Sequence, residues 1–594
     1  MPITAITIEN FKGIKDPVRI ELKPINLLFG ANSAGKSTVI QALHYAREIF
    51  ERNNCDPNKT IAGGDTIDLG GFKNLVHGQL KKGKEIKLSL EYNLSSEELP
   101  EYSKGYENLK DDVVPDYDPD DEEEHERLRI FEKFVEQERI NDYKTFPDKV
   151  STATVTLTIR WNVLDGKAYV AVYEVDINES PFATIKASSD CRQITLTHLN
   201  ICHPIFGGSW ESTQSYLDDI RDSFANENED YINNEIYSTL DSDDEGLSHK
   251  ILFLLEIGYI SSLVVTGTKP IGLYNHKSAL PQWDLPISMH ENVWTTSSSI
   301  DERGYFVKML SSLIYGPGEL IRNNLKSICY LGPLRKIPPR AFQPQRYLEK
   351  GRWADGLAAY DILFWGDDIL VKKTNEWFSE EKRLNSGYNL EIKKFKELGN
   401  DHPVMQAISQ NDESVTLATL KELFFDENSE LRQNILKIPS KRRLLFRDNK
   451  TDIELSLQDI GVGISQVLPV IVAALSAKSG IVVIEQPELH IHPAFQVVLG
   501  DLFIEQIRER PDVTFILETH SEHLLLRLLR RIRETSNGEA PADLKLKPSD
   551  LSINFIEQGK EGVVCTTIGV DEEGDFTDRW PRGFFAERSQ ELFG

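Results

Sequence analysis

The sequence contains 594 residues, about four times the length of a typical single domain, and therefore predicts two to four structural units. Hydrophobic residues make up 40% of the chain and charged residues 27%, a balance typical of a globular protein rather than a disordered one. The formal net charge of −27 excludes a histone-like basic coat for nucleic acid, although it leaves room for a local basic patch. Residues 111–126 hold ten carboxylates, and we expect them to form a solvated loop.

Cysteine spacing and hydropathy indicate a cytoplasmic chain. The five cysteines lie far apart without a C-x-x-C pair, which argues against a disulfide scaffold or a cysteine zinc site. The N-terminal residues lack the basic segment and apolar run of a signal peptide. The most apolar stretch, residues 251–265, is too short to span a bilayer and contains Glu256, so we interpret it as a core helix and expect no membrane partner.

The first two hundred residues predict strands around one loop and one helix. Residues 3–11 alternate in period two, residues 18–22 form a second short strand, and residues 25–29 are a continuous apolar run suited to a buried strand. A glycine-containing loop and an apolar repeat at helical spacing over residues 37–50 follow. Four further alternating segments between residues 85 and 200 predict an antiparallel β lobe.

The rest of the chain is first helical and then alternates helices with strands. Residues 205–325 have a helical pattern without a heptad repeat long enough for a coiled-coil arm. The last third alternates strands and helices, which favours a parallel α/β sheet. We expect an α/β fold with five parts: an N-terminal lobe (1–95), an antiparallel β lobe (96–200), a helical insertion (201–325), a C-terminal lobe (326–570) and a tail (571–594).

A phosphate-binding motif follows the predicted buried strand. Residues 30–37 fit the pattern G-x-x-x-x-G-K-[ST], which arises by chance in about 2% of such chains. Glycines let backbone N–H groups surround a phosphate at a helix N-terminus, the lysine reaches the β- and γ-phosphates, and the serine hydroxyl binds Mg²⁺. The sequence therefore predicts a site for ATP and Mg²⁺ made by Gly30, Ala31, Asn32, Ser33, Ala34, Gly35, Lys36, Ser37 and Thr38.

Two strand ends in the last third supply polar groups for such a site. The apolar run 481–484 ends in Glu485, which is placed to hold Mg²⁺ through water. The second apolar strand leads into Thr519 and His520. A histidine at this position either senses the γ-phosphate or is an ordinary core histidine.

A glycine turn before the Glu485 strand is a second candidate phosphate surface. Gly461, Gly463 and Ser465 open a predicted helix, and a glycine turn at a helix N-terminus attracts anions. The alternative is an ordinary capped helix start. His490 and His492 suggest a metal site, but we favour a structural loop.

Taken in order, these residues resemble the ABC-type ATPase heads of the structural-maintenance-of-chromosomes (SMC), RecF and overcoming-lysogenization-defect (OLD) proteins. The segment GVGISQ resembles their signature motif, IVVIEQPELHIHP a Walker B strand with its D-loop, and ETHSEH their histidine switch. Segments 68–78, 330–335 and 580–585 are similar to bacterial AAA-type ATPases with a short C-terminal domain of unknown function, such as those of the Septu and PARIS antiphage systems.

The resemblance implies a homodimer in which two heads enclose two ATP molecules, so that Ser465 and its glycines contact the γ-phosphate held by the other copy's Lys36. Many relatives follow the metal-binding acid with a catalytic glutamate, whereas this chain has Gln486. Either Glu488 activates water instead, or hydrolysis is slow. The chain ends too soon after the histidine switch for the TOPRIM nuclease domain of OLD proteins.

Two functions follow from these observations. The first is an ATP-gated dimer that senses a trigger and controls a separate effector, expected to be a nuclease, in antiphage defence. The second is a RecF-like ATPase that clamps DNA in repair or recombination, with residues 439–447 and 527–534 as basic patches; solvated helix faces are their plain alternative. Trp580, Phe584 and Phe585 form either a docking patch or part of the core.

Overall fold

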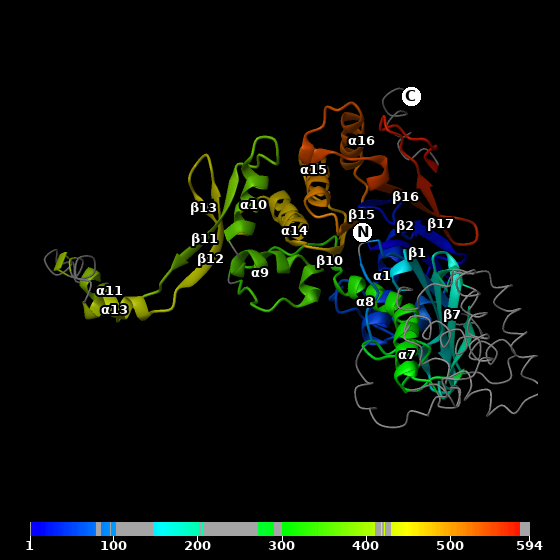
Figure 1. The fold of residues 1–594 in the computed structure, drawn as a ribbon. Helices are drawn as coiled ribbons and strands as arrows, with labels where there is room; N and C mark the ends of the chain where they lie inside the picture. The colour runs from blue at the N-terminus through cyan, green and yellow to red at the C-terminus, as the bar shows by residue number, and fades with distance from the viewer. Residues whose placement is uncertain are drawn as a thin grey trace, which may run out of the picture.

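A computed structural model describes residues 2–78, 85–95, 97–102, 147–200, 203–206, 271–289, 300–340, 342–366, 368–409, 417–418, 421 and 429–581 (Figure 1). The acidic run 111–126, the apolar stretch 251–265, most of the predicted helical insertion, and Phe584 and Phe585 lie outside the described residues. Within those ranges, no helix is both long and apolar enough to cross a membrane.

A six-stranded sheet forms the centre of the fold, in the order β10-β14-β15-β3-β16-β17. All its neighbouring strands are parallel except β16 and β17. Its strands are β3 (Ile25–Phe29), β10 (Cys329–Leu331), β14 (Gly480–Glu485), β15 (Val513–Glu518), β16 (Leu551–Gln558) and β17 (Val563–Ile568).

Both faces of this sheet are covered, which explains the continuous apolar runs in its strands. Ile481 and Val483 of β14 join the core cluster that contains helix α1 (Lys36–Arg52). Val482 and Ile484 of β14 join a second cluster with helices that precede and follow this strand in the sequence. Those helices are α14 (Val462–Ser476), α15 (Pro493–Glu509) and α16 (Glu522–Ser536).

An eight-stranded antiparallel sheet packs on the other side of α1, in the order β2-β1-β4-β5-β6-β7-β8-β9. Its strands are β1 (Ile3–Glu9), β2 (Val18–Glu21), β4 (Ile86–Asn93), β5 (Thr152–Asn162), β6 (Lys167–Ile177), β7 (Ser180–Ala187), β8 (Ile194–Leu199) and β9 (Ile271–Gly272). Since β4 pairs with β5 over its whole length, the expected boundary at residue 95 falls within one continuous sheet rather than between two lobes. The predicted α/β class with an antiparallel sheet is confirmed.

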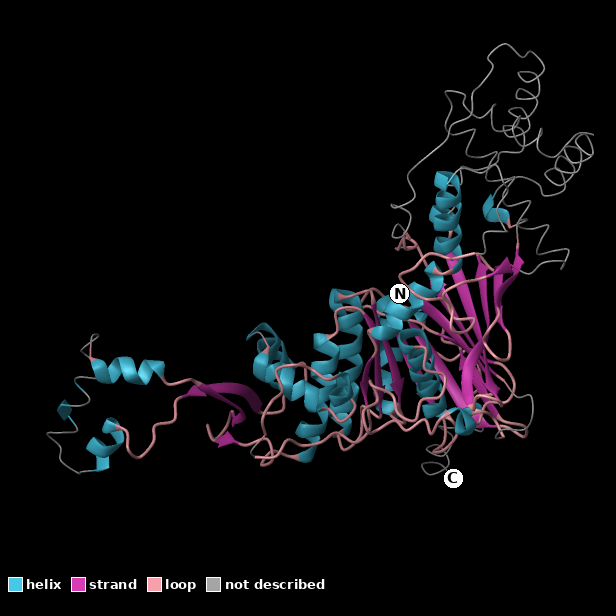
Figure 2. Ribbon diagram, turned by 90° about the horizontal axis from the view of Figure 1, so that it is seen from below, coloured by secondary structure: helices cyan, strands magenta, loops and turns pink. Residues whose placement is uncertain are grey.

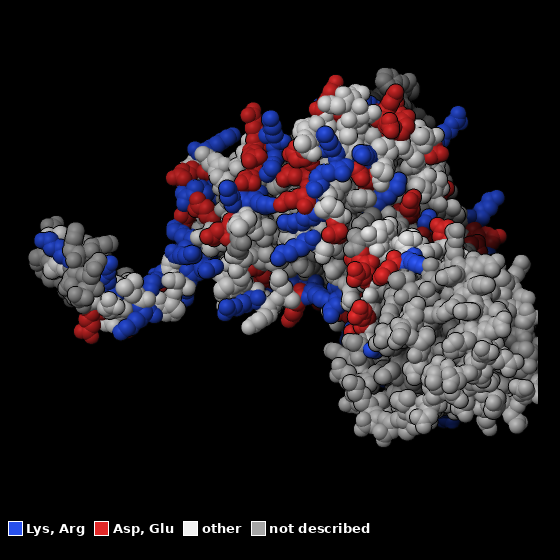
Figure 3. All heavy atoms as spheres, viewed as in Figure 1, with Lys and Arg blue, Asp and Glu red and all other residues white. Residues whose placement is uncertain are grey.

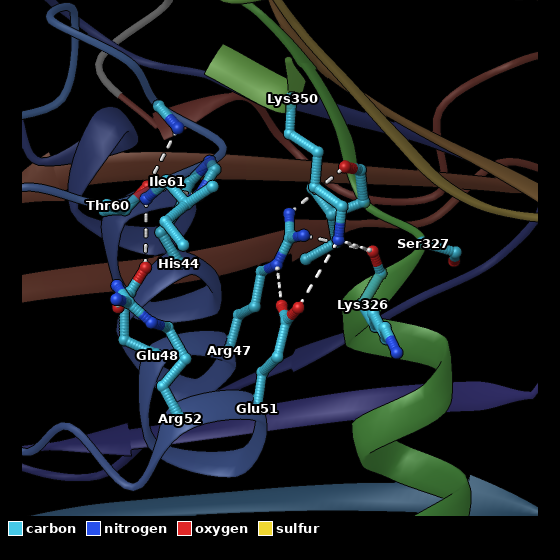
Figure 4. Close-up of polar contacts among 12 residues, drawn as sticks. His44, Arg47, Glu48, Glu51, Arg52, Thr60, Ile61, Lys326, Ser327 and Lys350 are labelled. Atoms are coloured by element: carbon cyan, nitrogen blue, oxygen red, sulfur yellow. Dashed lines mark hydrogen bonds and ion pairs between the residues drawn. The ribbon is translucent and has the colours of Figure 1, made fainter. Parts of the chain in front are cut away.

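Helix α8 (Gly316–Lys326) lies beside α1 and contacts strands of both sheets, and α7 (Ile300–Ile314) packs against α8. Arg47 of α1 is 1% exposed and donates hydrogen bonds to the carbonyls of Lys326 (3.1 Å) and Ile328 (3.3 Å) (Figure 4). A cation at a helix C-terminus is favourable, because the last carbonyls carry partial negative charge. Glu51 accepts from Arg47 (2.9 Å) and Lys350 (3.4 Å), so the far end of α1 is firmly anchored.

A narrow arm projects from the body and was absent from the sequence-based prediction (Figures 1 and 2). Its three-stranded antiparallel sheet comprises β11 (Tyr388–Phe395), β12 (Lys441–Asp448) and β13 (Glu454–Leu455), with α11 (Pro403–Ser409) and α13 (Glu430–Lys437) at the tip. The remaining elements are α2 (Phe72–Leu75), α9 (Leu357–Trp365), α10 (Asp368–Ser379), η2 (Pro147–Lys149), η3 (Pro204–Phe206), η5 (Lys350–Trp353), η6 (Ala542–Leu544) and η7 (Pro548–Asp550).

Candidate nucleotide site

The glycine-rich loop 30–37 connects β3 to α1, as the motif requires. Gly30 has a φ of +148°, and a Cβ atom there would lie 2.1 Å from the carbonyl oxygen of Ile556. Only glycine fits this close approach of two backbones. Gly35 precedes α1 with a φ of +106°, and no side chain caps the helix. The first N–H groups of α1 are therefore available to a phosphate.

Lys36 is buried in the loop with an exposed fraction of 4%. Its Nζ donates to the carbonyls of Gly30 and Ala31, each at 3.0 Å, and lies 4.0 Å from a carboxylate oxygen of Glu518. Burial lowers the pKa of the ammonium group, and the neighbouring carboxylates oppose that shift. The lysine charge is thus held inside the loop that would enclose the phosphates.

Glu518, the last residue of β15, is a site residue that the sequence analysis did not identify. Its Oε2 accepts a hydrogen bond from the Ser37 hydroxyl at 2.9 Å. Burial raises the pKa of Glu518, while Ser37 and Lys36 oppose the shift. The signal was present in the sequence, because Glu518 ends an apolar strand just as Glu485 does, and the two are register partners in neighbouring parallel strands.

Glu485 ends β14 beside this pair, as predicted for a strand-end acid. Its Oε1 accepts a hydrogen bond from the hydroxyl of Tyr330 (3.0 Å). Burial, followed by the negative charge of Glu518, raises the pKa of Glu485 to about 7. A carboxylate held near such a pKa is typical of functional sites.

Arg335 supports the turn after Glu485 and was also missed as a site residue. Its Nη2 donates to the carbonyls of Glu485 (2.7 Å) and Gln486 (3.0 Å). The side chain is 4% exposed, and burial lowers its pKa to about 10. Its Nε and Nη1 have no hydrogen-bond partner among the described residues. Gln486 itself has a φ of +46°, so the turn is strained and depends on these contacts.

Glu488 connects this turn to the predicted histidine switch. Its Oε2 accepts from the Thr519 hydroxyl (2.8 Å), and its Oε1 accepts from the backbone N–H of His520 (2.7 Å). The buried Nε2 of His520 has no partner in the described part of the chain. Burial, and then the charge of Lys36, lower the pKa of His520, so its ring is neutral near pH 7. The arrangement places a neutral imidazole near the phosphate loop.

The glycine turn before α14 is placed differently from the prediction in one respect. Gly461 caps α14 through its backbone and is exposed, and Val462 is 53% exposed. Ser465 lies one helical turn further in and is 0% exposed, so its hydroxyl is not available to a second molecule in this conformation. Gly463 approaches the D-loop, where a Cβ atom would lie 3.1 Å from the carbonyl oxygen of His490. Only the backbone end of α14 forms a surface.

The donor set fits ATP and Mg²⁺. Mg²⁺ prefers hard oxygen ligands and is bound in nucleotide sites by one or two carboxylates or hydroxyls together with phosphates. Ser37 and Glu485 offer such oxygens, and the loop leaves no room for a side chain at Gly30. Among the described residues, no group of three or more His, Cys, Asp or Glu forms a metal site of its own. His492 instead accepts a hydrogen bond from the backbone N–H of Ala494 and caps α15.

The helix at 527–534 is not a free basic patch. Arg527 and Arg531 both bind the carboxylate of Asp501, and Arg530 pairs with Glu534. Ion pairs of this kind leave little positive charge for a nucleic acid.

Trp580 packs edge-on against aromatic rings of the head, which favours the core alternative for this residue. Its ring centroid lies 5.5 Å from that of Phe29, 5.9 Å from Phe555 and 5.3 Å from Phe576.

Comparison with known proteins places the chain in a family. The family profile described as AAA ATPase domain matches residues 1–193 and 366–525, more than half of the chain. No curated protein sequence matches this chain. One similar solved structure is an SMC head bound to the C-winged helix domain of ScpA; it is 9% identical, has a TM-score of 0.35, and the match covers 96% of this chain and 98% of that chain. A second is an SMC head domain with an extended coiled coil bound to the C-terminal domain of ScpA from Pyrococcus furiosus, with 10% identity, a TM-score of 0.34, and coverage of 100% of this chain and 98% of that chain. A third is the SMC head domain from Thermotoga maritima, with 9% identity, a TM-score of 0.31, and coverage of 96% of this chain and 100% of that chain. On the strength of the family profile, the chain belongs to the AAA ATPase domain family.

Proposed function

We propose that the chain binds ATP with Mg²⁺ in the loop 30–37 and hydrolyses it slowly. The observation that supports this most strongly is the convergence of Lys36, Ser37 and Glu485 at the carboxyl ends of β3 and β14, the parallel strands on either side of β15. Ligands of open α/β sheets bind outside the carboxyl ends of the parallel strands. Ser37 and Glu485 would hold Mg²⁺, which neutralises phosphate charge when bound, and Lys36 would bind the β- and γ-phosphates.

Slow hydrolysis follows from the groups around the attacking water. The Gln486 amide cannot accept a proton as a carboxylate does. Glu488 already accepts hydrogen bonds at both oxygens, from Thr519 and His520, so it serves first to hold the histidine loop. A water beside the γ-phosphate therefore lacks a free carboxylate base, and ATP-bound molecules persist.

The exposed N-terminus of α14 supports ATP-dependent dimerisation. Gly461 and Val462 leave backbone N–H groups at the surface without a side-chain cap, and such a helix end attracts phosphate. A second copy whose loop 30–37 carries ATP would place the γ-phosphate there, reciprocally in both subunits. Sedimentation of the purified chain with and without Mg²⁺ and ATP tests this. ATP-dependent dimers are expected, and a monomer in both conditions contradicts the proposal.

Slow turnover and ATP-dependent association suit a switch better than a motor. We therefore propose that the dimer senses a trigger and controls a separate effector, a nuclease, in antiphage defence; the defence role comes from the family resemblance. A pull-down of the tagged chain from its native host with Mg²⁺ and ATP tests this. Stoichiometric recovery of a second, nuclease-like protein supports the proposal, and recovery of the chain alone contradicts it.

A RecF-like DNA clamp is the second candidate, and the arm favours it. Lys394 faces Arg442 as a direct partner across β11 and β12, whereas Lys393, which faces Arg443, pairs with Glu454 (Figure 3 shows Lys and Arg along the arm). Like charges directly opposite one another destabilise a ribbon, and a nucleic-acid phosphate between Lys394 and Arg442 would relieve this repulsion. Salt-dependent DNA binding that is lost on Lys394→Glu with Arg442→Glu would support a clamp. Absence of DNA binding at low salt would exclude it.

A further inference from the structure

The groups expected to bind phosphate and Mg²⁺ are engaged by the chain itself. The Ser37 hydroxyl donates to Glu518 at 2.9 Å instead of facing an open position. Lys36 donates to two carbonyls of its own loop and lies 4.0 Å from Glu518. Glu518 therefore contacts both residues on which nucleotide binding depends.

The charge of Glu518 opposes an incoming triphosphate. The side chain of Glu518 is 7% exposed, so water screens its charge poorly. Glu488 and the partly ionised Glu485, the register partner of Glu518, add further negative charge near Lys36. ATP without a metal would bring several negative charges toward Glu518, whose carboxylate lies beside Lys36.

We propose that Glu518 acts as an electrostatic latch that makes ATP binding conditional on Mg²⁺. Mg²⁺ held by Ser37 and Glu485 would offset the carboxylate charge, so that Ser37 would be freed from Glu518 and Lys36 would be free to bind the phosphates. Without the cation, Glu518 retains Ser37 and Lys36 and repels the nucleotide. The inference rests on the proposed nucleotide-binding role of the loop and concerns how that role is controlled.

The substitution Glu518→Gln isolates the charge. The glutamine amide oxygen still accepts the hydrogen bond from Ser37 and keeps the side-chain volume, so a purely structural role would be preserved. Glu518→Met, of similar volume, repeats the charge removal if the glutamine variant is unstable. Glu21→Gln, on the exposed end of β2, removes one negative charge far from the loop and is the matched control.

The experiment is calorimetric titration of ATP into the full chain, in Mg²⁺ and in EDTA, with thermal unfolding as a check on folding. The wild type should bind ATP in Mg²⁺ and about 100-fold more weakly in EDTA. Glu518→Gln should gain about 10- to 100-fold in affinity in EDTA, whereas Glu21→Gln should match the wild type.

Three results would overturn the inference, and they are distinguishable. If the wild type binds ATP equally well in Mg²⁺ and in EDTA, Glu518 does not make ATP binding depend on Mg²⁺, and the proposed function is unaffected. Folded Glu518→Gln that binds ATP in neither condition makes Glu518 a required ligand rather than a latch. A folded wild type that binds no ATP even with Mg²⁺ refutes the proposed function together with the latch.

Discussion

Replacing Arg335 by methionine should reduce ATP turnover while leaving the fold nearly as stable as before. Arg335 joins the carbonyls of Glu485 and Gln486 through one nitrogen, and no carboxylate lies within ion-pair distance of it among the described residues. Two hydrogen bonds from a charged donor contribute about 1.5–3 kcal/mol each. Burying an unpaired guanidinium costs several kcal/mol. These amounts nearly cancel, so the free energy of unfolding should change by no more than about 2 kcal/mol.

The loss of activity should exceed the loss of stability. Without Arg335 the strained turn at Gln486 is no longer held, and Glu485 and the residues after it shift. A misplacement of about 1 Å in such a site lowers the rate roughly 100-fold. We expect kcat to fall by that order while the Kd for ATP in Mg²⁺ changes less than threefold. Arg335→Lys should recover part of the rate, because one ammonium reaches one carbonyl well and two poorly.

Steady-state ATPase assays, ATP titration and thermal unfolding of the same samples measure these quantities. Arg340→Met is the matched control, since Arg340 lies in the same extended segment but pairs with Asp459 at the surface. An Arg335→Met variant with wild-type kcat would refute the positioning role. A variant that loses ATP affinity and kcat by the same factor would show that Arg335 binds nucleotide instead.

Three further predictions concern the backbone at Gly30, the missing general base at Gln486 and the pH dependence of stability. Gly30→Ala should lower the free energy of unfolding, measured in urea, by about 2 kcal/mol or more, because the new Cβ would lie 2.1 Å from the Ile556 carbonyl oxygen. The control Gly461→Ala, whose Cβ would meet no atom within 4 Å, should have little effect, and equal stability of the two variants would contradict the structure. Gln486→Glu should raise turnover by about tenfold or more by supplying a general base, and an unchanged rate would show that Gln486 does not limit it. Burial lowers the pKa of His44 to about 3, so the unfolded chain binds a proton near pH 6.5 that the folded chain does not. The free energy of unfolding should therefore fall by up to about 1.4 kcal/mol per pH unit as the pH drops below 6.5. Urea unfolding at pH 7 and pH 5 should show a smaller fall for His44→Gln than for the wild type.

The central strand, loop and helix of the site were predictable from local sequence. An apolar run of five residues, two glycines at fixed spacing and a helical repeat specify this unit without distant contacts. Glu485 was predictable for a similar reason, because a charged residue that ends a buried strand must lie where the strand leaves the core.

The partners of these residues depend on strand order, which no local pattern encodes. Ser37 and Glu518 are 481 residues apart and meet only because β15 pairs with β3. Arg335 comes from an extended segment after β10, whose place beside β14 is likewise set by the sheet. The glycine turn does open a helix, as predicted, but α14 begins at Val462 and turns Ser465 toward the core in this conformation.

The arm shows another limit of sequence periodicity. Helix–strand alternation predicts layers of a compact domain, but β11 and β12 pair outside the main sheet and carry α11 and α13 away from it (Figure 2). Leu390, Leu444 and Phe446 reach the second core cluster, but exposed residues elsewhere in both strands break the apolar alternation, so the pairing is hard to predict.

The measurement that tests the central claim most directly is ATP hydrolysis by the purified full chain with Mg²⁺, for the wild type and Lys36→Ala, with thermal unfolding as a check on folding. Lys36 is the positive charge within the glycine loop, so its loss should abolish turnover. The account predicts slow but measurable release of phosphate by the wild type and none by Lys36→Ala. Equal rates for the two proteins would contradict it, because the loop 30–37 would then not be where ATP is hydrolysed.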